Sequence, residues 1–81
     1  MEQMNTIYLV SVVNQETGEL YFEYDCTDQV VIIAENELEA MMNAKSESCC
    51  MHVPLGYELK CKSIGITELE KEMVLESYNA G

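Results

Sequence analysis

The chain has 81 residues, of which 15 are acidic and four are basic, and its formal net charge is −11. This length suffices for one small domain, so we predict a single small acidic α+β domain over residues 1–81. The charge argues against direct binding to nucleic acid or to an anionic membrane, because both partners are recognised by clustered basic side chains.

The composition is typical of a folded protein rather than a disordered one. Apolar residues make up 48% of the chain, which supplies enough hydrophobic material for a core. The longest apolar run, at residues 30–34, has five residues, far fewer than the ~18 needed to span a membrane. The N-terminus lacks the positive charge of a signal peptide, so we expect a cytoplasmic location and free thiols.

Three strands are predicted in the first half of the chain. Residues 6–13 are rich in β-branched and aromatic side chains and predict a mostly buried strand. Turn-forming residues around Gly18 then lead to a predicted returning strand at 20–24, which would complete a hairpin. After a polar break at 25–28, residues 29–34 give the clearest buried strand.

A helix follows the third predicted strand. Asn36 is a good N-cap, and Glu39 lies three residues later as in a capping box, so we predict a helix from residue 37 to about 45 or 47. The helical spacing predicts an inward stripe, with Ala40 and Ala44 beside it, made of Leu38, Met41, Met42 and the stem of Lys45. We expect Met41 and Met42 to line the surface that packs on the sheet.

Two more strands are predicted after a loop at 46–56. Residues 57–64 alternate, which predicts a half-exposed strand with Tyr57, Leu59 and Cys61 directed inward. A single helical turn is predicted at 67–70, and a last short strand at 73–78, where a helix end is the alternative. The expected fold is one main helix packed on a small antiparallel sheet in the order β-β-β-α-β-β.

The cysteines and the single histidine raise the question of a metal site. Cysteine and histidine are zinc ligands, and the weak alternative site would comprise Cys49, Cys50, His52 and Cys61. The chain has no C-x-x-C pair, and the simpler interpretation treats Cys26 and Cys61 as small core residues. A catalytic thiol would need an assembled base, and nearby carboxylates disfavour the thiolate. We therefore expect neither enzymatic activity nor a cofactor, with a Cys/His metal-binding module as an alternative.

The acidic residues are concentrated between residues 16 and 39, which suggests a negative surface that binds a basic groove of a protein. Two tyrosines in the same stretch, Tyr21 and Tyr24, are candidate contact residues because tyrosine is enriched at interfaces. The candidate partner-binding carboxylates are Glu16, Glu19, Glu23, Asp25, Asp28, Glu35, Glu37 and Glu39. A soluble acidic protein, in which charge only prevents aggregation, is the alternative.

Three segments of the chain carry recognisable motifs. They are residues 8–10, the strand–helix junction at 30–40 with its AENE–EA pattern, and the tail at 74–81, which is similar to SFNAG but has Tyr78 in place of Phe. Together they resemble a group of small, uncharacterised phage- and prophage-encoded single-domain proteins. These motifs are structural, so the resemblance implies a fold and a viral origin and transfers no functional residue.

Small acidic phage proteins often bind a host enzyme or defence complex, so the resemblance suggests a function. We predict a non-enzymatic inhibitor of a host protein with a basic surface, such as an anti-CRISPR or another anti-defence factor that mimics DNA. It would act in the cytoplasm of an infected or lysogenic host cell. The alternative is a small structural or assembly protein that forms a homodimer through a sheet edge or the Met41–Met42 face.

Overall fold

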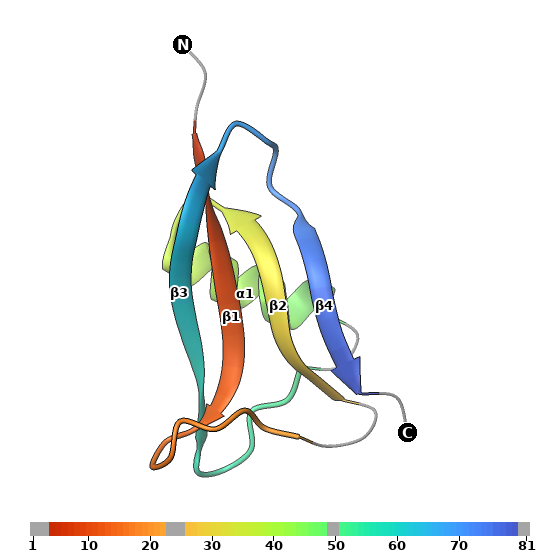
Figure 1. The fold of residues 1–81 in the computed structure, drawn as a ribbon. Helices are drawn as coiled ribbons and strands as arrows, with labels where there is room; N and C mark the ends of the chain where they lie inside the picture. The colour runs from red at the N-terminus through yellow and green to blue at the C-terminus, as the bar shows by residue number, and fades with distance from the viewer. Residues whose placement is uncertain (1–3, 23–25, 49–50, 80–81) are drawn as a thin grey trace.

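A computed structural model describes residues 4–22, 26–48 and 51–79. These residues form four strands and one helix, which are β1 (Asn5–Asn14), β2 (Cys26–Ala34), α1 (Glu37–Glu47), β3 (Tyr57–Thr67) and β4 (Met73–Asn79). The strands make one antiparallel sheet, and α1 lies across one of its faces, behind the sheet in Figure 1. The α+β class predicted from the sequence is therefore confirmed.

The strand order across the sheet is β3-β1-β2-β4. β1 is antiparallel to both of its neighbours, so β2 and β3 run parallel to each other and are joined through α1. β3 and β4 lie on opposite edges, and the connection at residues 68–72 crosses the end of the sheet to join them (Figure 1). The part of the chain described by the structure has no helix that is both long and apolar enough to cross a membrane.

The predicted strand at 20–24 does not form, so the order β-β-β-α-β-β is wrong and the observed order is β-β-α-β-β. Residues 19–21 only begin to pair with the end of β1, through a bridge between Leu20 and Val13 and a hydrogen bond of 2.8 Å from the backbone N–H of Tyr21 to the carbonyl of Val12. Residues 23–25 lie outside the described residues. The pairing goes no further because β2 occupies the same edge of β1 from Thr6 to Ser11, and β3 occupies the other edge.

The hydrophobic core lies between α1 and the sheet. Alternate residues of the two central strands point toward the helix, as expected for the period of two in a strand. The buried cluster contains Tyr8, Val10, Val12, Val30, Ile32, Ala34, Ala40, Ala44 and Met51. The predicted inward residues of β3, Tyr57, Leu59 and Cys61, pack against this cluster and are confirmed.

α1 begins and ends where the sequence predicts, but it packs through a different stripe. The Asn36 side chain accepts a hydrogen bond of 2.8 Å from the backbone N–H of Glu39, so the predicted N-cap is confirmed. Ala40 and Ala44 are fully buried and Met41 is half-buried. Leu38 and Met42 are 66% and 61% exposed, so the predicted stripe through these two residues is wrong. Alanine side chains let the helix backbone approach the sheet closely, where Tyr8 and Ile32 already fill the space.

The second half of the chain follows the prediction except at one turn. The predicted strand at 57–64 forms and extends to Thr67, and the last strand forms as β4. The predicted helical turn at 67–70 is absent from the described structure, because Thr67 remains in β3. Its Oγ1 accepts a hydrogen bond of 3.1 Å from the backbone N–H of Leu69, which closes a side-chain-capped turn instead.

The alanine face of α1 leads to a stability prediction. We expect Ala44→Leu to lower the free energy of unfolding by about 1–3 kcal/mol, because the larger side chain overpacks the closed helix–sheet contact. Leu38→Ala, on the exposed side of the same helix, should change it by less than about 0.5 kcal/mol. Urea unfolding followed by circular dichroism measures both. A larger loss for Leu38→Ala would show that α1 packs through the stripe of Leu38 and Met42.

Candidate functional site

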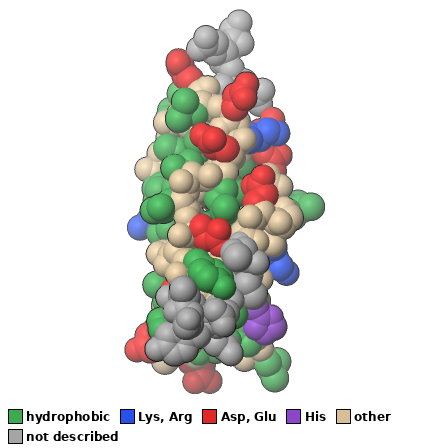
Figure 2. All heavy atoms as spheres, turned by 90° about the vertical axis from the view of Figure 1, so that its right-hand side faces the viewer, with side chains coloured by type: hydrophobic (Ala, Val, Ile, Leu, Met, Phe, Trp, Pro, Cys, Tyr) green, Lys and Arg blue, Asp and Glu red, His purple; other side chains and the backbone are tan. Residues whose placement is uncertain are grey.

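Acidic side chains from two distant segments meet at one end of the sheet. The first segment is the start of α1, and the second is the connection between β3 and β4. Together they form what we call the acidic end, made of Glu35, Glu37, Glu39, Glu68, Glu70 and Glu72. Glu39 is half-buried and the others are exposed. In Figure 2, acidic side chains gather toward the upper end and the centre of the view.

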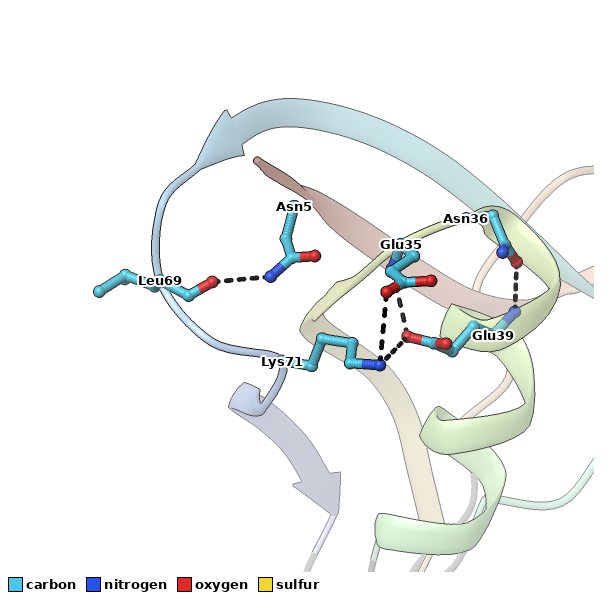
Figure 3. A network of polar contacts seen from close by, with 6 residues as sticks. All are labelled: Asn5, Glu35, Asn36, Glu39, Leu69 and Lys71. Carbon is cyan, nitrogen blue, oxygen red and sulfur yellow. Dashed lines mark hydrogen bonds and ion pairs between the residues drawn. The ribbon is translucent and has the colours of Figure 1, made fainter. Parts of the chain in front are cut away.

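Two hydrogen bonds hold the connection at residues 68–72 against the start of β1 and the end of β2. The Asn5 side-chain amide donates a hydrogen bond of 2.9 Å to the carbonyl of Leu69 (Figure 3). The backbone N–H of Ile33 donates one of 2.8 Å to the carbonyl of Glu72. These two bonds hold the backbone of the connection in place, so the residues that carry its carboxylates have defined positions on the molecule.

Lys71 joins the two segments electrostatically. Its Nζ lies 3.5 Å from Oε1 of Glu39 and 3.8 Å from Oε1 of Glu35 (Figure 3). Glu39 also accepts a hydrogen bond of 3.2 Å from the backbone N–H of Glu35, the residue before the N-cap. Lys71 is the only basic side chain in the two segments, so the acidic end keeps a strongly negative charge.

A surface depression of about 350 Å³ lies at this end, lined by Asn5, Glu35, Glu70 and Lys71. Sites for small organic ligands are mostly apolar with a few polar groups. This depression is instead lined by charged and amide side chains. Its chemistry suits contact with a charged macromolecular surface better than enclosure of a small molecule.

The structure does not bring the sequence-predicted carboxylates together on one surface. Glu16 and Glu19 lie in the turn after β1, whereas Glu35, Glu37 and Glu39 lie at the opposite end of the sheet. The pairing of Thr6 with Ala34 marks the acidic end. Asn14 is eight residues further along β1, or about 26 Å at the rise of a strand. The single patch anticipated from the sequence is thus divided between two ends.

Two further predicted residues are not on the exposed surface. Asp28 is 8% exposed, within β2 at an irregularity in its pairing with β4. Next to it, the hydroxyl of Thr27 donates a hydrogen bond to the Glu76 carboxylate. Tyr21 is half-buried and packs against the core, with its ring centroid 5.0 Å from that of Tyr57. The remaining predicted contact residues, Glu23, Tyr24 and Asp25, lie outside the described residues.

The residues of the alternative metal site are not brought together in the described part of the chain. Cys61 pairs with Val10 on the helix-facing side of β3, and His52 is exposed in the loop after α1. Among the described residues no group of three or more His, Cys, Asp and Glu side chains could hold a metal ion. Cys49 and Cys50 lie outside the described residues.

The Cys61 thiol is held in its protonated form. Burial raises the pKa of this thiol above its ordinary value, and the negative charge of Glu37 raises it further. The thiolate is the form that attacks electrophiles and binds metals. Cys61 is therefore suited to a packing role at neutral pH, which agrees with its contact with the core cluster.

Sequence reasoning missed the acidic residues of the β3–β4 connection. Glu68, Glu70 and Glu72 form an alternating acidic run much like the run at Glu35, Glu37 and Glu39. Their proximity depends on β4 pairing with β2 at the far edge of the sheet, and no local pattern specifies that pairing. The only sequence signal that could have pointed to Glu68, Glu70 and Glu72 was the similar composition of the two acidic runs.

Comparison with known proteins gives no match of this chain to a protein family, to a curated protein or to a solved structure.

The environment of Cys61 predicts an unusual alkylation profile. Because its pKa is raised, we expect the midpoint of the pH–rate profile for iodoacetamide to lie above that of an exposed cysteine. Glu37→Gln should move the midpoint down only part of the way, since burial remains. Glu70→Gln removes a carboxylate not implicated in this shift and is the control. Peptide mapping by mass spectrometry isolates the Cys61 signal, and an ordinary midpoint would contradict the expected burial.

Proposed function

We propose that this chain is a phage- or prophage-encoded, non-enzymatic binding protein that inhibits a host protein by occupying a basic, nucleic-acid-binding groove. The observation that carries the proposal is the acidic end, where carboxylates from α1 and from the β3–β4 connection converge around a single lysine. The phage origin and the anti-defence role rest on the sequence resemblance.

The charge of the acidic end supports binding to a basic groove. A surface with many carboxylates and few lysines attracts a groove that binds phosphates, and it accelerates the encounter. Leu69 lies between Glu68 and Glu70 and is exposed, so it offers apolar area within the acidic surface. Interfaces gain most of their affinity from such buried contacts, while charges provide orientation and speed.

Preorganisation supports the same proposal. The hydrogen bonds from Asn5 to Leu69 and from Ile33 to Glu72 hold the connection in place without a partner. A loop that is already ordered loses less conformational entropy on binding. The carboxylates are therefore carried on an ordered backbone rather than on a flexible acidic tail.

Capture from a bacterial host lysate at two salt concentrations, with the captured proteins identified, tests the proposal. We expect retention at about 0.1 M salt and loss at about 1 M, since the Debye length falls from about 10 to about 3 Å. Duplex nucleic acid added at low salt should displace the same host protein if both occupy one groove. Retention that resists both salt and nucleic acid would reject the proposed occlusion.

Matched variants locate the binding surface. The first replaces Glu37, Glu68 and Glu70 with glutamine at the acidic end, and we expect capture to fall at least about tenfold. The second replaces Glu16, Glu19 and Glu58 with glutamine elsewhere on the molecule, and it should bind nearly as well as the original chain. Both variants have the same net charge, so an equal loss in the two would exclude a defined acidic end.

A further inference from the structure

The two central strands are apolar on both faces, although α1 covers only one. Toward the helix they present the core residues, and away from it they present Ile7, Leu9 and Val31, which are half-buried, and Ile33, which is already buried where its N–H meets the carbonyl of Glu72. A strand with one face in water normally alternates between apolar and polar residues, and runs that are apolar on both faces are typical of strands covered on both sides. The composition of β1 and β2 therefore indicates a second covering layer.

No described element covers the sheet on the side away from α1, which faces the viewer in Figure 1. We call this side the open face. Its centre comprises Leu9, Val31 and Leu75, which line a shallow hollow of about 30 Å³ together with Gln29 and Ser77. Leu75 is 66% exposed. In Figure 2, hydrophobic side chains follow the left-hand margin, which is the side of the open face.

The charge of the open face differs from that of the rest of the molecule. In β3 the charged residues that point away from the helix are Glu58, Lys60 and Lys62. Lys62 pairs with Leu9 and Lys60 with Ser11, so both lysines border the apolar centre. Two of the four basic residues of the chain thus lie on this face. A second strongly acidic molecule meets the least repulsion there.

We propose that the open face binds a second copy of this chain, forming a two-sheet sandwich with the helices on its outer sides. An apolar centre with a polar rim is the usual anatomy of an interface, and a two-fold axis places the same patch against itself. Aligned sheets pack about 10 Å apart at about 30°, an arrangement that would cover Leu9, Val31 and Leu75 in both copies.

The size of the open face sets the expected affinity. Four strands at about 4.8 Å spacing and seven residues at about 3.3 Å give a flat footprint of about 440 Å² on each copy. The two copies together would bury about 880 Å², which is the size of a weak and transient interface, so we expect a dissociation constant in the micromolar range. The interface differs from the sheet edge and the Met41–Met42 face considered from the sequence.

Sedimentation equilibrium over about 1 to about 300 μM, a range that brackets a micromolar dissociation constant, tests this dimer. Leu75→Glu places a charge at the centre of the interface in both copies and should raise the dissociation constant at least about tenfold. Leu38→Glu is the matched control, because Leu38 is also a leucine with 66% exposure but lies on the outer side of α1. It should change the constant less than about twofold. Circular dichroism confirms that both variants fold.

The effect of salt concentration distinguishes the proposed dimer from the proposed binding to a host protein. Added salt screens the repulsion between two acidic copies and leaves the apolar contact intact, so dimerisation should strengthen, whereas binding of the acidic end to a host protein should weaken. A chain that stays monomeric throughout the concentration range would overturn the dimer, and so would equal effects of the two leucine variants. Neither result bears on capture through the acidic end.

Discussion

The arrangement of the molecule depends on one constraint, the use of both hydrogen-bonding edges of β1. With β3 along one edge and β2 along the other from Thr6 to Ser11, only the last residues of β1 are left to pair with the segment that follows it. The chain therefore passes through α1 to reach the third strand. β4 pairs with the remaining edge of β2, at the far side of the sheet from β3. The crossing connection follows from this order, and the acidic end depends on that connection.

The large side chains on the helix-facing side of the sheet explain why α1 packs through alanine. The helix spans a sheet whose centre is already filled by Tyr8, Val10 and Ile32, so small side chains at Ala40 and Ala44 give the closest fit. Leu38 and Met42 are consequently left in solvent. The larger apolar residues of this short helix therefore do not decide which of its faces packs on the sheet. That face is decided by the shape of the sheet surface, which is formed by residues far away in the sequence.

Local chemistry explains which parts of the fold could be predicted. The N-cap at Asn36, the alternation of β3 and the β-branched runs of β1 and β2 are local signals, and each gave the correct element. The partner of each strand is a tertiary property, so the short apolar segment after Gly18 was mistaken for a strand. The candidate site was predicted in part for the same reason. Glu35, Glu37 and Glu39 were identified, while Glu68, Glu70 and Glu72 join them only through the pairing of β4 with β2.

The direction of the strands determines how the molecule can be attached to something else. β1 begins beside the acidic end, since Asn5 pairs with Thr67 and contacts Leu69. β4 runs away from that end and finishes opposite Cys26, at the same end of the sheet as the turn after β1 (Figure 1). A tag or fusion partner joined after β4 would project away from the carboxylate array and leave it accessible. One joined ahead of β1 would stand next to that array and shield it from large partners.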